Sequence, residues 1–221
     1  MINSTTAERY YRESHQAICD LITEENEHLP VPACPGWTLH DLLSHVTGVL
    51  QDFVSRNTEG APGSDWTAAH VDRFRDAHIE SVKSAWRAAL DQAGPIFRRM
   101  GNQLLPDVVT HEFDARGALG NSDERDSARL NAALDVLIQW GDAYYRNAAL
   151  PPLELRLNGM VRNLGDGEPE AVIDTDPFTA SRVLTGRRSE AQIRELDWSA
   201  DPSPWISSMS LLGKRDTDLH E

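Results

Sequence analysis

The residues best suited to chemistry in this sequence are an aspartate and a histidine four positions apart. Asp107 and His111 occur in the stretch LPDVVTHEFDARGALG, whose apolar flanks are typical of a helix. Positions i and i+4 share one helix face, with β-carbons about 5–6 Å apart, so both side chains can reach a single ion. The spacing therefore fits a metal site, although helical Asp/His pairs more often form solvated salt links.

A third ligand has to come from another helix, and His45 is the best candidate. It lies in the middle of TLHDLLSHVTGVLQDFVSR, on the same side as Leu42 and Val49, so we expect it to point into the protein. Imidazole nitrogen and carboxylate oxygen suit zinc or a similar divalent ion, and three protein ligands leave one position open. A hydrogen-bonded core histidine is the alternative. We expect the other histidines to lie on the surface: His15, His28, His40, His70, His78 and His220.

Three charged residues follow the first pair of candidates along the same helix. Glu112 lies about 100° round the helix from His111, so we do not expect it to bind the same ion. Asp114 is placed to accept a hydrogen bond that orients His111. Arg116 is suited to bind a substrate carboxylate with its planar guanidinium, or to form an ion pair within the protein.

Cys34 and a pair of arginines have both a structural and a functional interpretation. We interpret Cys34 as a buried small residue in a tight Pro-Gly turn, although a thiol near a helix N-terminus can also be a nucleophile. Arg187 and Arg188 precede a helix in TGRRSEAQ. They fit a surface turn that pairs with acidic groups, or a site for an anionic or sugar-bearing thiol.

Composition limits the possible partners. The chain has 221 residues and a formal net charge of −14, spread along its length, which disfavours binding to nucleic acid and to anionic membranes. It has no apolar run of about 20 residues and its N-terminus lacks the pattern of a secretory signal, so we expect a cytoplasmic protein. It also lacks G-x-G-x-x-G, Walker, H-E-x-x-H and G-x-S-x-G patterns, which leaves a nucleotide cradle, a zincin-type protease and an α/β-hydrolase without support.

The periodicity predicts a mainly α protein. Prolines and glycines separate the segments with helical spacing from one another. Thr38 and Asp41 have the spacing of a helix N-cap and its first-turn acid. The predicted helices cover residues 6–28, 39–56, 67–93, 105–120 and 125–149, with a short helical turn within 95–104.

Beyond Pro151 the pattern changes to a small α/β region. LELRLNG alternates like a half-buried strand, and GEPEAVIDT is a candidate hairpin partner across LGDG. DPFTASRVLTG and SEAQIREL predict two short helices that begin with capping residues. We therefore predict a helical bundle over residues 1–150 and a small α/β appendage over residues 151–221.

Three motifs resemble one known family. PACPGWTLHDLLSHVTGV matches C-P-G-W-[ST]-x-x-[DE]-[LV]-x-x-H from Cys34 to His45, the opening signature of the mycothiol-dependent maleylpyruvate isomerase family. DVVTHEFDARGALG resembles its second signature, and DPFTASRVLTGRRSEAQIRELDWSADP resembles its C-terminal segment. The three motifs occur in the family's order and span residues 32–202.

The resemblance implies a DinB-like four-helix bundle with a divalent metal, such as zinc, bound by His45, Asp107 and His111. Family members often have Glu at the position of Asp107, so we expect a looser or water-bridged ligand here. The implied cofactor is mycothiol, an actinobacterial thiol whose metal-held thiolate attacks an electrophilic carbon.

Two outcomes of that attack are open, a cis–trans isomerase and a thiol S-transferase. A thiol-independent lyase or hydrolase and a non-catalytic metal-binding bundle remain alternatives. The expected partners are therefore a small-molecule substrate and a low-molecular-weight thiol, for a protein that is either a monomer or a homodimer.

Overall fold

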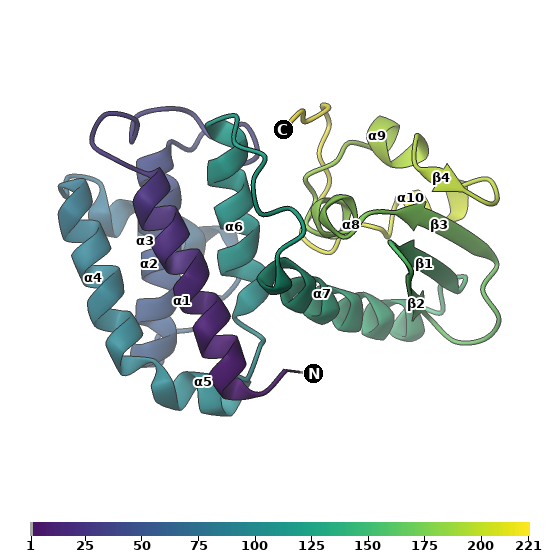
Figure 1. Ribbon diagram of the computed structural model, residues 1–221, viewed down its shortest axis with the longest axis horizontal. Helices are drawn as coiled ribbons and strands as arrows, with labels where there is room; N and C mark the ends of the chain where they lie inside the picture. Colours follow the sequence, from purple (N-terminus) through teal and green to yellow (C-terminus); the bar gives the residue numbers. More distant parts are fainter. Residues whose placement is uncertain (1) are drawn as a thin grey trace. The chain divides into compact units, whose positions relative to one another are not determined.

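The computed structural model describes residues 2–221 and contains two compact units. The first comprises the chain up to Asp123 together with Glu221, and the second spans Glu124–His220. The protein is mainly helical with a small sheet in the second unit (Figure 1), which confirms the predicted fold class.

The first unit is a helical bundle. Its helices are α1 (Ser4–Leu21), α2 (Leu39–Ser55), α3 (Ser64–Phe74), α4 (Ile79–Gln92), α5 (Gly94–Met100) and α6 (Leu105–Ala118). Helix α2 contacts α3, α4 and α6, while α1 contacts α5 and α6. Between α1, α4 and α5 the rings of Tyr11, Trp86 and Phe97 meet edge to face in a buried aromatic cluster.

Two helix boundaries in this unit differ from the prediction. Helix α1 ends at Leu21 instead of continuing to His28, because the side chain of Asn26 donates to Leu21 O at 2.9 Å and accepts from Thr23 N at 2.8 Å. The helix predicted over residues 67–93 is two helices, α3 and α4. The break falls at His78, whose side chain caps the first turn of α4 by accepting from Glu80 N.

The second unit packs helices against a four-stranded sheet. Its elements are α7 (Ala128–Asn147), β1 (Leu153–Leu157), β2 (Met160–Leu164), β3 (Ala171–Thr175), α8 (Pro177–Leu184), α9 (Glu190–Arg194), β4 (Asp197–Trp198) and α10 (Ser203–Ile206). The strand order is β2-β1-β3-β4, with β1 and β3 parallel and the other neighbours antiparallel. The two predicted short helices are present as α8 and α9, capped by Asp176 and Ser189.

The predicted hairpin partner of β1 was wrong. The hairpin is formed by β1 and β2 around Asn158-Gly159, where both residues have positive φ, as a two-residue hairpin turn requires. The predicted partner, β3, does pair with β1, but it is parallel to it, with Leu155 opposite Ile173.

Helix α7 belongs with the sheet. It contacts β2 and α8, and its buried residues Leu137 and Tyr145 are part of the core that also contains Leu153 and Ile173. The units therefore divide after Asp123, whereas the predicted domains, 1–150 and 151–221, place this helix in the bundle. The difference arises because the apolar face of α7 matches the sheet core, which periodicity within one helix does not reveal.

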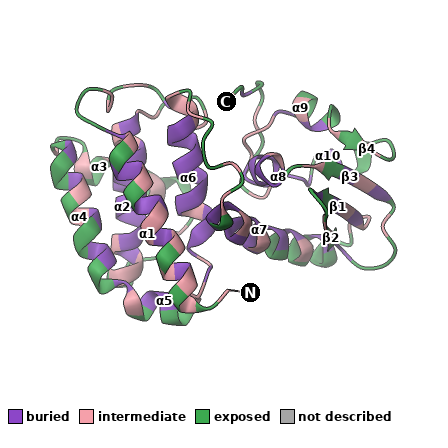
Figure 2. Cartoon of the chain, viewed as in Figure 1, coloured by how far each residue is buried: buried purple, intermediate pink, exposed green. Residues whose placement is uncertain are grey.

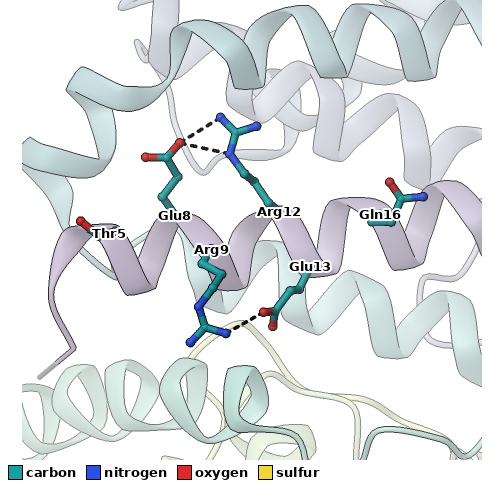
Figure 3. A pocket seen from close by; sticks show the side chains of 6 residues that line it. All are labelled: Thr5, Glu8, Arg9, Arg12, Glu13 and Gln16. Carbon is teal, nitrogen blue, oxygen red and sulfur yellow. Dashed lines mark hydrogen bonds and ion pairs between the residues drawn. The ribbon is translucent and has the colours of Figure 1, made fainter.

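Helix α1 carries a shallow hollow of about 490 Å³ on its outer face. Figure 3 shows its lining, in which Arg9 pairs with Glu13 at 2.8 Å and Arg12 pairs with Glu8 at 2.9 Å. Both ion pairs have the i, i+4 spacing that is common on a solvated helix face. The hollow is therefore part of the ordinary solvent-exposed surface. Among residues 2–221, no helix is both long and apolar enough to cross a membrane.

Candidate metal centre

Helix α2 positions His45 by burying one long apolar stripe. The helix begins with a capping box, in which Asp41 N donates to Thr38 Oγ1 and Thr38 N donates to the Asp41 carboxylate at 2.8 Å. Leu42, Leu43 and Val46 are fully buried, so the stripe fixes the rotation of the helix. His45 lies in the same stripe and is only 5% exposed.

Helix α6 positions Asp107 and His111. Pro106 lies in its first turn, where no backbone donor is needed, and the two side chains follow one turn apart on one face. No residue of Leu105–Ala118 is exposed, and Figure 2 shows the helix buried along almost its whole length. Its polar side chains are therefore largely shielded from water and need hydrogen-bond partners within the protein.

The three predicted ligands converge. The Nε2 atoms of His45 and His111 lie 3.5 Å and 3.7 Å from Asp107 Oδ1, beyond the ordinary hydrogen-bond range of about 2.7–3.2 Å. Ligand atoms at about 2.0–2.1 Å from a tetrahedral zinc ion lie about 3.3–3.4 Å from one another. Although Asp is one methylene shorter than Glu, the Asp107 carboxylate reaches both histidines. Its distances to the two Nε2 atoms fit a shared ion better than direct hydrogen bonds.

The charges at this centre also fit a cation. Oδ2 of Asp107 is buried and accepts no hydrogen bond from any residue of the described chain, 2–221. Burial raises the pKa of Asp107, but His45 and His111 outweigh it and hold that pKa below its usual value. Burial lowers the pKa of His45. A carboxylate beside a neutral imidazole is the protonation state that a metal requires of its ligands.

The second ring nitrogen of His111 is held by an acid, as the sequence predicts. Nδ1 of His111 donates to Asp114 Oδ2 at 3.0 Å, which leaves Nε2 to face Asp107 and His45. Cys34 Sγ also donates to Asp114 Oδ2, at 3.3 Å. Cys34, His111 and Asp114 are close enough to hold an ion, but hydrogen bonds already account for their approach.

A Pro-Gly turn brings Cys34 and Trp37 to the centre. Trp37 N donates to Cys34 O at 3.0 Å, and Gly36 has a φ of +87°, which only glycine adopts readily. The ring of Trp37 lies 5.0 Å from the His45 ring and 5.9 Å from the His111 ring, measured between centroids. The tryptophan therefore packs against both histidines.

Comparison with known proteins identifies the family. The sequence model described as "Mycothiol maleylpyruvate isomerase N-terminal domain" matches residues 11–122, half of the chain and all three converging side chains. The chain belongs to this family. No curated protein matches the chain by sequence.

The fold agrees with the family. A crystal structure of the mycothiol-dependent maleylpyruvate isomerase and a crystal structure of its histidine-to-alanine mutant each superpose with a TM-score of 0.57. Each comparison covers 90% of this chain and 94% of the other, at 11% identity. The likeness shows that the chain shares the fold of these structures.

The three arginines with a predicted binding role, Arg116, Arg187 and Arg188, each donate to another group of the protein. Nε of Arg116 donates to Glu112 Oε1 at 2.9 Å, and both residues are buried. In the second unit, Arg187 donates to Thr185 O at 2.6 Å and Arg188 to Arg187 O at 2.9 Å. Of the two interpretations given for Arg116, the ion pair is the one that is formed.

The sequence did not reveal the residues that hydrogen-bond to the three candidate metal ligands or to their partners. His15 and His70, expected on the surface, are both buried, and His70 contacts His45. Asp52 and Cys34 were also not recognised as neighbours of the centre. One signal was available in α2, where His45 and Asp52 are seven residues apart and therefore lie on one face.

Proposed function

We propose that this protein is a metal-dependent enzyme that uses mycothiol, or a similar low-molecular-weight thiol, on an electrophilic small molecule. The observation that carries the proposal is the approach of His45 Nε2, His111 Nε2 and Asp107 Oδ1 to within 4.8 Å of one another. Two imidazoles and one carboxylate are a donor set that suits zinc or a related ion and leaves a position open. Membership of the mycothiol maleylpyruvate isomerase family supports the choice of thiol.

Several residues have separate proposed roles at the centre. His45 and His111 would bind the ion through Nε2, Asp107 would supply the negative charge, and Asp114 keeps the Nδ1 proton of His111 turned away. When bound there, a divalent ion lowers the pKa of a coordinated thiol from about 8.5, so that it is held as a thiolate at neutral pH. Trp37 packs on both imidazoles and limits access of water from that side.

The reaction proposed first is cis–trans isomerisation of a maleylpyruvate-like diacid, with S-transfer as the second possibility. Arg187 and Arg188 are the proposed partners of an anionic or sugar-bearing thiol, whereas Arg116 is held by its ion pair with Glu112. Changing Arg187 or Arg188 to Gln should raise KM for the thiol at least about tenfold while kcat changes less. The use of a small thiol, together with Cys19 and Cys34, which form no disulfide, would fit work in a reducing cytoplasm.

Turnover with and without thiol tests the proposal. Purified protein is stripped with a chelator, reloaded with zinc, and given maleylpyruvate with mycothiol, with glutathione, or with no thiol. Formation of the trans isomer that needs both metal and thiol supports an isomerase, and a stable thioether product supports an S-transferase. Turnover without thiol would instead identify a lyase or hydrolase, and zinc-free wild-type protein would leave only the non-catalytic bundle.

A further inference from the structure

His70 lies between the proposed metal ligand His45 and a buried carboxylate. Its Nδ1 is 3.3 Å from Nδ1 of His45, and its Nε2 is 3.0 Å from Oδ2 of Asp52. His70 is fully buried and Asp52 is 2% exposed. We propose that Asp52 and His70 form a positioning pair that fixes His45 as the tautomer with its proton on Nδ1 and a bare Nε2. The metal role of His45 in this inference rests on the proposed function.

Asp52, the acceptor at one end of the series His45–His70–Asp52, decides the direction of its hydrogen bonds. Asp52 is ionised, because hydrogen bonds from His70 and Arg73 outweigh the effect of burial and hold its pKa below the usual value. A carboxylate only accepts, so Nε2 of His70 must carry a proton. A neutral His70 then has a bare Nδ1, which can only accept, and Nδ1 of His45 must be the donor. This leaves the Nε2 lone pair of His45 facing Asp107 and His111.

Helix α2 is built to receive the His70 ring. His45, Gly48 and Asp52 are spaced i, i+3 and i+7, so they lie along one face. A β-carbon at Gly48 would lie 2.5 Å from the His70 ring, far inside van der Waals contact. Glycine at that position is therefore what allows the ring to lie between the histidine and the aspartate.

The pair is also closed off on its outer sides. Arg73 donates to Oδ1 of Asp52 at 2.8 Å and to Gln51 at 3.0 Å, which fixes the carboxylate. The Trp66 ring stands edge-on to the His70 ring, with centroids 4.2 Å apart. Shielding from water strengthens each hydrogen bond in the chain and makes a switch to the other tautomer costly.

NMR of the metal-free protein tests the tautomer directly. In a sample with ¹⁵N-labelled histidine, long-range proton–nitrogen correlations distinguish a protonated ring nitrogen from a bare one. We expect His45 protonated on Nδ1 and His70 protonated on Nε2 at neutral pH. Finding His45 protonated on Nε2 would overturn the proposal, and this result does not depend on whether the protein binds metal or turns over substrate.

Metal affinity tests the consequence. Asp52→Asn keeps the side-chain size and replaces the carboxylate with an amide, and His70→Phe removes both ring nitrogens. We expect both variants to weaken binding of zinc, and of cobalt followed by its visible spectrum, by about 10–100-fold. His15→Phe, at a buried histidine away from the centre, is the matched control and should bind as the wild type does.

Two further results keep the outcomes separate. Asp52→Glu restores a carboxylate and should recover part of the affinity and the His45 tautomer. If Asp52→Asn and His70→Phe are folded, by circular dichroism and thermal midpoint, and bind metal as tightly as the wild type, the positioning role is excluded. If the wild type itself binds no metal, the proposed function fails, and the tautomer is still decided by the NMR measurement.

Discussion

His15 and His70 are both buried histidines of the first unit, and their surroundings are opposite in character. His15 in α1 lies against the edge of Trp86, with ring centroids 4.6 Å apart, and 3.8 Å from the Cys19 sulfur. His70 in α3 lies between a carboxylate and a second imidazole. Burial alone therefore does not mark a functional histidine, whereas the partners of its two ring nitrogens do.

The largest expected difference between the two regions is in metal binding. His45→Ala or His111→Ala removes one of the three proposed ligands and should weaken zinc binding by more than about 100-fold, the upper range for changes outside the ligand set. His15→Ala should leave the zinc content at the wild-type value. Metal analysis after dialysis measures this, and equal zinc in all three variants would contradict the assignment of the centre.

The second difference is in the response to pH. Burial, then the nearby Arg87 and Arg12, lower the pKa of His15 to about 4, against about 6.5 in the unfolded chain. Between those values the unfolded chain binds more protons, so stability is complete above pH about 6.5 and declines toward pH 4. The loss due to His15 should be up to about 3 kcal/mol.

Denaturation of the wild type and of His15→Gln at several pH values isolates this effect. The variant should lose less stability than the wild type between pH 7 and pH 4. Parallel curves for the two proteins would mean that His15 titrates normally in the folded state.

A third test compares glycines in helices. Gly48→Ala forces a β-carbon into the His70 ring, and overpacking of about 1–3 kcal/mol should exceed the gain of about 1 kcal/mol in helix propensity. Gly141→Ala in α7 meets Leu164 at 3.5 Å, an ordinary contact, so it should be neutral or stabilising. Urea midpoints measure both, and a stabilised Gly48→Ala protein would show that the ring of His70 is free to move.

The smallest effect is expected on the outer face of α1. The ion pair between Arg9 and Glu13 is exposed, so solvent screens it. Arg9→Ala should leave the thermal midpoint unchanged within error, in contrast to substitutions at His15 one and a half turns along the same helix. A clear loss of stability would show that this face contacts something other than water.

The sequence was a good guide wherever short-range spacing decides the structure. Thr38 and Asp41 predicted the start of α2, and the four-residue spacing of Asp107 and His111 predicted that their side chains share one face. Both depend on contacts within one or two helical turns. His45 could be placed on the inner side of its helix for the same reason.

Features that depend on distant contacts were not predictable. His70 is buried because α3 packs on α2 over a glycine, and nothing within α3 marks that residue. Cys34 reaches Asp114, 80 positions away, through the direction of a Pro-Gly turn. The hairpin at Asn158-Gly159 was an exception, because its turn residues are a local signal that was overlooked.

The nearly complete burial of α6 limits where changes in this protein can be tolerated. Because most side chains of Leu105–Ala118 fill space or contact a neighbour, random changes there should mostly destabilise the protein. Libraries that seek a changed ligand preference would do better in the loop of residues 56–63, whose side chains are largely exposed. We therefore expect tolerated variation in this protein to lie mainly in exposed loops such as residues 56–63, and little of it in α6.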